Sequence, residues 1–403
     1  MWASFHLLQQ SNSILKISKV LFFLIFPLIL FSCDQKKGPS VITPAFYYWK
    51  TTAYNWQNPP ESRKENYGKT MDSLQVKKTY LRLFDIDWDE FYKEPVPIAP
   101  IDLDWGSYYS EYELPTDHEY VFVVFLTSRI FEKSGMGDII RLASNISTKV
   151  LIYQSNLLKK KARVTARKLG EDEWGARGSF IIDSLSEILR KQKMEIQFDC
   201  DWTNSTKDKY FAFLKSFKSF DKKDDISATI RLDQYKNFKE RGVPPVDRGM
   251  LMCYNVGNFR NPTEKNSIFN VKEIKKYLNG DKYPLELDIA LPVFHWMLWY
   301  RDNQFKSIVN GFNLDELSKD GVFTNEDGMR ACLKDTVISN YYFRRGDRIR
   351  IEQPEITDVL EVVELLKTKI DIKGKTVAIF DYDKVNLEKY GLDKVASVFR
   401  AFN

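Results

Sequence analysis

Residues 194–203 constrain the fold of this chain more than any other stretch. They predict a short strand that is followed at once by a helix over 205–217. Strand side chains alternate between two faces. One face would be polar, with Glu195, Gln197, Asp199 and Asp201. The other would be apolar, with Ile196, Phe198, Cys200 and Trp202. A strand of a helix-covered barrel with a polar lumen fits this pattern, and its last residues lie where barrel enzymes carry their active groups. The alternative is an antiparallel strand with one solvated face, but the helix and the apolar strand that follow favour the barrel.

Strand and helix patterns alternate along most of the chain, as in proteins with a parallel sheet. We expect strands over 45–49, 79–87, 120–126, 194–201, 226–232, 249–254, 285–291 and 376–380. We expect helices over 69–76, 139–168 (one or two helices), 179–191, 267–278 and 387–402. Eight strands in this order predict an α/β fold of the (β/α)8 TIM-barrel type, glycosidase-like, formed by 44–403 as a single domain. Residues 92–115 are expected to form a long loop, and 305–353 an insertion after strand seven.

The first 33 residues predict an export signal rather than a part of the fold. Lys16 and Lys19 precede an apolar run over 20–31, which ends in Leu-Phe-Ser and Cys33. This order resembles a bacterial lipobox, in which the cysteine carries the lipid. The alternative is an uncleaved N-terminal anchor. Residues 34–43 would be a linker, and the protein an exported lipoprotein, anchored in a membrane of the cell envelope and facing the periplasm or the cell surface.

Composition argues against several classes of function. The 60 basic and 55 acidic residues give a net charge of only +5, and the basic run at 158–167 reads as a solvated helix face, so we expect no nucleic-acid partner. Four Cys without a CxxC motif and three His without HExxH predict no metal site. Gly135-Met136-Gly137 lacks the third glycine of a dinucleotide motif, since that position is Ile140. We therefore expect no cofactor, and a monomer.

Carboxylates gather where the predicted strands end. They are Asp85, Asp87, Asp199, Asp201, Asp381 and Asp383. Glycosidases use a proton donor with a raised pKa and a second group that stabilises an oxocarbenium-like centre. Asp199 and Asp201 would lie about 7 Å apart on one strand, close enough for each to perturb the pKa of the other. The alternative is that these acids form a lumen ion network with Arg82 and Arg231.

Further residues near the same strand ends are candidates for binding a glycan. They are Trp49, Asp85, Asp87, Arg231, Glu286, Asp288, Trp296 and Asp381. Tryptophan and Tyr254 could form the floor of a sugar site, although single aromatic residues more often belong to a core. His295 is expected to be structural rather than a catalytic base.

Four segments together resemble the run from strand four to strand seven in the family-18 glycoside hydrolases. They are 198–202, 226–229, 252–255 and 289–294. Residues 46–50 and 196–199 also look like a related, uncharacterised family of exported bacterial barrels. The resemblance implies catalytic roles for Asp199, Asp201 and Tyr254, with Asp201 as acid or electrostatic stabiliser and Asp199 tuning its pKa.

The chain departs from that pattern at two positions. Thr203 occupies the place of the family's proton-donating glutamate, and Asn255 that of its strand-six aspartate. Either Asp85, Glu286 or Asp381 supplies the proton, or the barrel binds a glycan without cutting it. The sequence thus predicts an envelope lipoprotein that acts on or binds a glycan; the alternative is a non-catalytic glycan-binding or structural lipoprotein. A metal-dependent deacetylase or esterase would lack histidine ligands.

Overall fold

The computed structural model describes residues 41–49, 67–101, 115, 117–171, 175–309, 317, 321–338 and 341–403. The predicted signal peptide and lipidation site at Cys33 lie outside these residues. Residues Val41–Asn403 form one compact unit. None of the helices described within it combines the length and the apolar character that crossing a bilayer requires.

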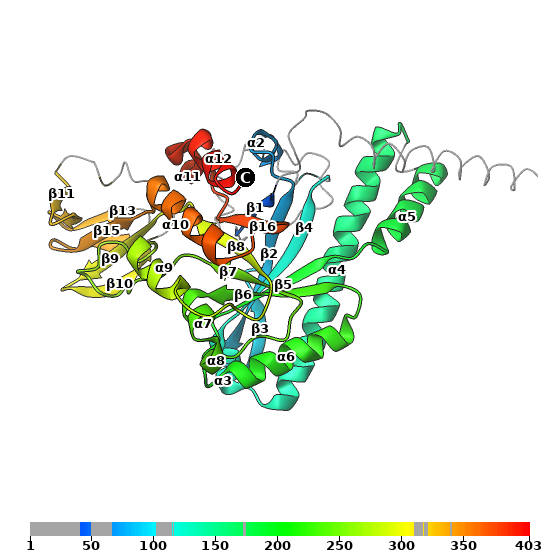
Figure 1. Ribbon diagram of the computed structural model, residues 1–403, viewed down its shortest axis with the longest axis horizontal. Coiled ribbons are helices and arrows are strands. Elements are labelled where there is room, and N and C mark those ends of the chain that lie inside the picture. The colour runs from blue at the N-terminus through cyan, green and yellow to red at the C-terminus, as the bar shows by residue number, and fades with distance from the viewer. Residues whose placement is uncertain are drawn as a thin grey trace, which may run out of the picture. The chain divides into compact units, whose positions relative to one another are not determined.

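Eight parallel strands form a closed barrel (Figure 1). Their order around it is β1-β16-β8-β7-β6-β5-β4-β2, and pairing of β1 with β2 closes the ring. The strands are β1 (Ile42–Tyr48), β2 (Lys78–Asp89), β4 (Glu119–Leu126), β5 (Glu195–Cys200), β6 (Asp225–Arg231), β7 (Arg248–Met252), β8 (Leu287–Pro292) and β16 (Lys375–Phe380). The predicted fold class is therefore confirmed.

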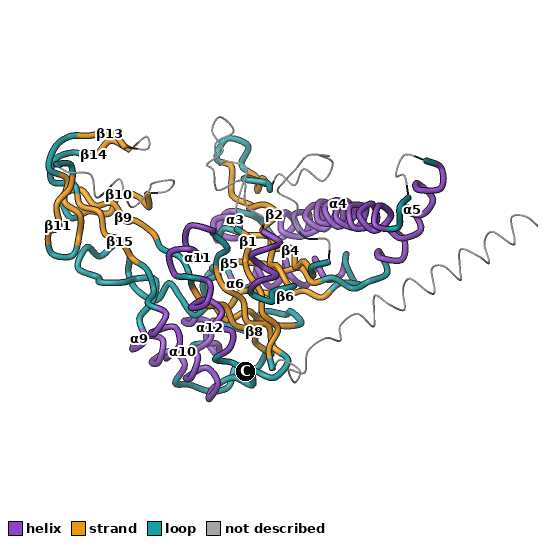
Figure 2. Tube along the Cα trace, turned by 90° about the horizontal axis from the view of Figure 1, so that it is seen from above, coloured by secondary structure: helices purple, strands orange, loops and turns teal. Residues whose placement is uncertain are grey.

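Helices follow the strands and cover the barrel (Figures 1 and 2). They are α2 (Tyr67–Ser73), α3 (Ser128–Lys133), α4 (Met136–Lys168), α5 (Ala176–Arg190), α6 (Lys207–Phe220), α7 (Leu232–Lys236), α8 (Phe238–Arg241), α9 (Val271–Leu278), α10 (Ile356–Lys369), α11 (Lys384–Tyr390) and α12 (Leu392–Arg400). The segment 139–168 belongs to a single helix, α4. The predicted C-terminal helix is two helices, because Gly391 adopts a left-handed backbone with φ of 84° between them.

The alternation predicted for residues 194–200 is present in β5. Gln197 accepts a hydrogen bond from the Tyr47 hydroxyl across the lumen, and Asp199 accepts one from Thr229 of β6. On the other face, the ring of Phe198 packs edge-on against Phe213 and Phe217 of α6. The polar side chains of this strand therefore face inward, and its apolar ones form the layer between barrel and helices.

The predicted loop over 92–115 is wrong for its first part. Residues Glu94–Ile98 form strand β3, which pairs antiparallel with the end of β2. Two prolines, Pro95 and Pro97, concealed this strand in the sequence. Proline is tolerated there because β3 lies at an edge of the sheet, where no partner needs its N–H.

The insertion after strand seven begins at Trp296 rather than at residue 305. It contains a five-stranded antiparallel sheet in the order β10-β9-β15-β12-β11 and a separate pair, β13 and β14 (Figure 2). The strands are β9 (Trp296–Arg301), β10 (Gln304–Val309), β11 (Phe323–Glu326), β12 (Met329–Cys332), β13 (Thr336–Ile338), β14 (Tyr341–Phe343) and β15 (Arg348–Glu352). Its small core around Met297, Phe343 and Ile349 is separate from the barrel core.

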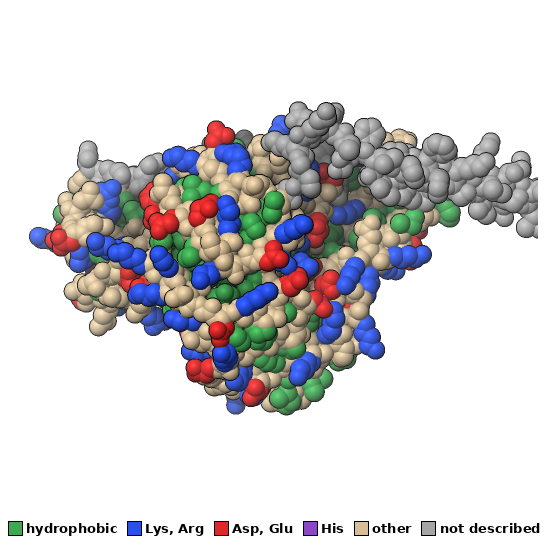
Figure 3. All heavy atoms as spheres, viewed as in Figure 1, with side chains coloured by type: hydrophobic (Ala, Val, Ile, Leu, Met, Phe, Trp, Pro, Cys, Tyr) green, Lys and Arg blue, Asp and Glu red, His purple; other side chains and the backbone are tan. Residues whose placement is uncertain are grey.

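Lys and Arg side chains are interspersed with Asp and Glu on the face that Figure 3 shows. Several form short ion pairs, such as Lys218 with Asp247 at 2.8 Å and Lys239 with Asp281 at 2.6 Å. This mixture is what nearly equal numbers of basic and acidic residues lead one to expect.

Candidate functional site

Asp199 ends the inward face of β5 and is almost fully buried. The Thr229 hydroxyl donates a hydrogen bond of 2.6 Å to its Oδ1 atom. Burial raises the pKa of Asp199 to about 7, and the nearby carboxylates of Asp201 and Asp85 act in the same direction. Near neutral pH this carboxyl group therefore carries a proton for a substantial part of the time.

Asp201 lies just beyond β5 and faces solvent. Its Oδ1 atom is 3.1 Å from Nε of Arg231, which ends β6. The side chains are 53% and 40% exposed, so this ion pair contributes little to stability but offers both charges to a ligand. The contact agrees with the alternative interpretation, in which strand-end acids form an ion network with Arg82 and Arg231.

A bulge in β2 brings Arg82 and Asp85 to the same face. The pairing with β4 shifts register between Arg82 and Phe84, so Leu83 is an additional residue. In a regular strand, residues three apart would face opposite sides. Here Nε of Arg82 donates to Asp85 Oδ1 over 2.6 Å, and its Nη2 atom contacts Asp85 Oδ2.

Trp49 lies beside this pair. The guanidinium of Arg82 is 5.0 Å from the centre of the Trp49 ring. Burial raises the pKa of Asp85, whereas the hydrogen bonds and the charge of Arg82 oppose that increase. Trp49 and Asp85 are thus brought together at the barrel mouth through Arg82.

Asp87 follows two residues further along β2. Its Oδ1 atom accepts a hydrogen bond of 2.6 Å from Thr127, and its Oδ2 atom lies 3.3 Å from Nη1 of Arg129 in α3. Its side chain remains one quarter exposed. It marks the edge of the mouth rather than its centre.

Aromatic rings form a wall that adjoins these charges, since the ring of Phe380 lies 5.3 Å from that of Trp49. Tyr254 follows β7, is buried, and stacks on Phe380 with ring centres 5.3 Å apart. Phe294 packs edge-on against both rings. Burial raises the pKa of Tyr254, and the charges of Asp199 and Asp381 add to the effect. Tyr254 therefore stays protonated and can act as a hydrogen-bond donor, while half-buried Asp381 directly follows Phe380 in the same wall.

Glu286 and Asp288 do not join this group, because they lie at the amino end of β8. Glu286 precedes the strand and pairs with Lys375 at 2.7 Å. Asp288 accepts a hydrogen bond of 2.7 Å from the backbone N–H of Thr376 and lies 3.5 Å from Arg248. The prediction that both residues lie at the mouth was wrong. Alternation along the strand identifies the side chains that face inward, but it does not show at which end of the strand each one lies.

Trp296 and His295 lie where the chain leaves the barrel for the insertion. The Trp296 indole donates to Glu352 over 2.8 Å, and its ring lies 6.0 Å from that of Phe294. Trp296 thus adjoins the aromatic wall through Phe294. His295 contacts the side chain of Asn386 through Nδ1, and burial lowers its pKa. This environment agrees with the structural role that we expected for it.

Thr203 lies in the turn that precedes α6. Its backbone N–H donates to the Thr206 hydroxyl over 2.9 Å, and its carbonyl accepts the N–H of Lys207 over the same distance. Its side chain carries no acidic proton that could be transferred to a glycosidic oxygen.

Sequence reasoning missed Thr229 and Phe380 as parts of the site. Thr229 was recognisable as an inward residue of β6, but its contact with Asp199 depends on the register of two strands. Phe380 reads as an ordinary apolar strand residue. Its position next to Tyr254 follows from the order of β16, β8 and β7 in the sheet.

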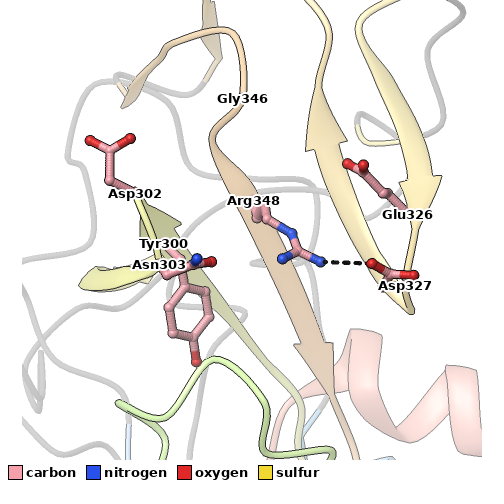
Figure 4. A pocket seen from close by; sticks show the side chains of 7 residues that line it. All are labelled: Tyr300, Asp302, Asn303, Glu326, Asp327, Gly346 and Arg348. Carbon is pink, nitrogen blue, oxygen red and sulfur yellow. Dashed lines mark ion pairs between the residues drawn. The ribbon is translucent and has the colours of Figure 1, made fainter.

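Metal-binding clusters and pockets outside the barrel mouth add no further candidate site among the described residues. In the parts of the chain that the structure describes, no group of three or more His, Cys, Asp or Glu could hold a metal ion. A pocket of about 290 Å³ lies in the inserted sheet, lined by Tyr300, Asp302, Asn303, Glu326, Asp327, Gly346 and Arg348 (Figure 4). Arg348 approaches Asp327 only at 3.9 Å, and Asp327 is almost fully exposed. Most of the lining residues belong to hairpin turns of the inserted sheet.

No protein-family model matches this chain, and no curated protein matches it. Among solved structures, the spore cortex-lytic enzyme SleL of Bacillus cereus is 13% identical, covers 91% of this chain and 76% of its own, and has a TM-score of 0.45. A glycoside hydrolase family 18 N-acetylglucosaminidase from Paenibacillus barengoltzii is 10% identical, with 89% and 99% covered and a TM-score of 0.40. A chitinase-like agglutinin from Robinia pseudoacacia is 11% identical, with the same coverage and TM-score. The strand pairings described above define the fold independently of these similarities.

Proposed function

We propose that the mouth of this barrel binds a glycan and does not hydrolyse it. The observation that carries the proposal is the meeting of Asp199, Asp201 and Arg231 with the aromatic wall of Tyr254 and Phe380 at one end of the barrel. Sugar rings present hydroxyl groups at their edges and C–H groups on their faces. Carboxyl and guanidinium groups suit the first, and aromatic rings the second.

Binding is favoured over hydrolysis by the state of the exposed groups. Cleavage of a glycosidic bond requires an acid that reaches the leaving oxygen. Thr203 cannot act as that acid, Asp201 is paired with Arg231, and Asp85 is buried against Arg82. The polar groups of the mouth are thus arranged to hold hydroxyl groups.

Hydrolysis is the second candidate, and Asp199 is the observation that favours it. Its pKa of about 7 makes it a proton donor at neutral pH, and Asp201 lies close enough to raise that pKa. In this mechanism Asp199 would protonate the leaving oxygen and Asp201 would stabilise the positive charge on the sugar ring.

The proposal is tested with the chain from residue 34 and a panel of chitin oligomers and peptidoglycan fragments. Calorimetry measures binding, and reducing-end assays measure turnover. We expect binding without turnover, and a loss of affinity of about tenfold or more in Asp201→Asn and Arg231→Gln, since each removes one charge of the pair. Asp281→Asn removes an exposed partner of an ion pair elsewhere and is the matched control.

The outcomes separate the two candidates. Turnover that disappears in both Asp199→Asn and Asp201→Asn would make hydrolysis the function. Absence of binding and turnover across the whole panel would overturn both candidates.

We also propose that the protein is exported and tethered to a membrane of the cell envelope by a lipid on Cys33. The support is the order of basic residues, apolar run and Leu-Phe-Ser-Cys in the first 33 residues. Full-length protein expressed in a bacterial host should incorporate labelled palmitate and sediment with membranes, whereas Cys33→Ala should not be labelled. Ser11→Ala, in the same segment, is the control. Label that persists in Cys33→Ala would refute the assignment.

A further inference from the structure

The β2–β3 hairpin extends past the end of the barrel. Pairing of β2 with β4 ends where Ile86 meets Leu126, but β2 continues to Asp89, where β3 pairs with it. The turn that joins the two strands holds Phe91 and Tyr92, whose side chains are among the most exposed large apolar ones described, at 85% and 67%. Contiguous exposed apolar side chains are a feature of interaction surfaces.

Several contacts hold this tip in place. Oδ1 of Asp89 accepts hydrogen bonds of 2.8 Å from the backbone N–H groups of both Phe91 and Tyr92. Glu90 pairs with Arg129 at 2.8 Å and also contacts Lys133, and both partners belong to α3. The two rings pack edge to face with centres 5.0 Å apart. The exposed rings are therefore presented by a fixed turn, which lowers the entropy lost when a ligand binds.

The tip is physically connected to the barrel mouth. Arg129 contacts Glu90 at the tip through Nη2 and Asp87 at the mouth edge through Nη1. Asp85 and Asp87 belong to the same strand as the tip, and the charge of Asp85 acts on the buried Asp199 of the lumen. A chain molecule that occupies the mouth and leaves it over Asp87 would reach Phe91 and Tyr92 next.

We infer that Phe91 and Tyr92 form an outer stacking site for the part of a glycan chain that extends out of the barrel mouth. The inference rests on the proposed function and adds to it a class of ligand: an oligosaccharide or polymer, bound more tightly as it lengthens. A lipid bilayer is a poorer occupant. Inserting the rings into hydrocarbon would also bring Asp89, Glu90 and Lys93 out of water, which is costly.

The test compares short and long ligands of one series, chitotriose and chitohexaose, on the chain from residue 34. Phe91→Ala/Tyr92→Ala should weaken chitohexaose about tenfold, the size expected for losing one or two ring contacts, and leave chitotriose unchanged. Phe180→Ala removes a ring that is 54% exposed on α5 and should change neither affinity. Glu90→Gln keeps the rings but loosens the turn, so it should weaken chitohexaose alone, by a smaller factor.

Each result decides between specific alternatives. If the double variant and the wild type bind chitohexaose equally well, the outer site is overturned. The proposed function still stands in that case, provided that the wild type binds chitotriose. Loss of both affinities in the double variant also overturns the outer site. Failure of the wild type to bind either sugar overturns the proposed function and this inference with it. Sedimentation with anionic phospholipid vesicles that is lost in the double variant assigns the rings to a membrane instead.

Discussion

Asp199 and Asp201 are two residues apart, yet they meet different surroundings. Asp199 points into the lumen, is cut off from water and accepts one hydrogen bond from Thr229. Asp201 lies beyond the strand, half exposed, with Arg231 beside it. Burial disfavours the charged form of a carboxyl group. The buried Asp199 is therefore partly protonated near pH 7, whereas the side chain of Asp201 is open to solvent.

Burial of Asp199 makes stability depend on pH. Its pKa is about 7 in the folded state and roughly 3.9 in the unfolded chain. At a pH below the unfolded-state pKa, Asp199 is protonated in both states and does not lower the free energy of unfolding. As the pH rises toward 7, the unfolded state releases this proton more readily than the folded state, so stability falls. The decrease levels off once the pH exceeds the folded-state pKa.

Replacing Asp199 by Asn should remove this dependence, since the amide has no charge to bury and can still accept from Thr229. The free energy of unfolding of the variant, relative to that of the wild type, should be roughly 2 to 3 kcal/mol higher at pH 8 than at pH 5. Urea unfolding at both pH values measures the difference. Asp281→Asn should show no such gain, and identical pH profiles for Asp199→Asn and the wild type would contradict the assignment.

At the scale of elements, a buried carboxylate at the end of β15 is the centre of a network that joins the inserted sheet to the barrel. Glu352 accepts hydrogen bonds from Arg350, from the N–H and hydroxyl of Ser267, and from the Trp296 indole, at 2.6 to 2.8 Å. Arg350 in turn donates to the carbonyl of Asn261 over 2.7 Å. The insertion and the loop that follows Tyr254 are therefore fixed to each other.

Glu352→Gln should destabilise the protein by about 3 kcal/mol, because it leaves the buried guanidinium of Arg350 without a counter-charge. The emission of Trp296 should also change, since its indole loses a charged acceptor. Urea unfolding followed by tryptophan fluorescence measures both effects. Glu326→Gln on exposed β11 is the control, with an expected change below about 0.5 kcal/mol. A Glu352→Gln variant as stable as this control would show that the network contributes nothing.

At the scale of the whole described molecule, stability is unevenly distributed. The barrel core is continuous from β1 to α12. The helix α5 instead packs on the end of α4 through a small separate cluster of Ala162, Ala166 and Ile182. Elements with few buried apolar contacts open at lower free energy than the main core.

Native-state hydrogen exchange should therefore reveal two levels of protection. Amides of α5 should exchange through openings that cost roughly 3 kcal/mol less than those that expose β5. Leu185→Ala, on the face that meets α4, should lower the protection of α5 and leave that of β5 unchanged. Equal protection in both elements would mean that α5 unfolds only with the barrel.

The sequence by itself determined the architecture, because period-two and helical patterns are local properties that each segment carries. Eight strands, the inward face of residues 195–199 and the existence of an insertion could all be read in this way. Tertiary structure decided what depends on register and closure. The bulge at Leu83 paired Arg82 with Asp85, and strand ends placed Asp288 away from the mouth. The strand order β16-β8-β7 brought Phe380 to Tyr254. Burial raised the pKa of Asp199, whereas Asp201 stayed exposed beyond the strand. These contacts join residues far apart in the chain, so no local pattern contains them.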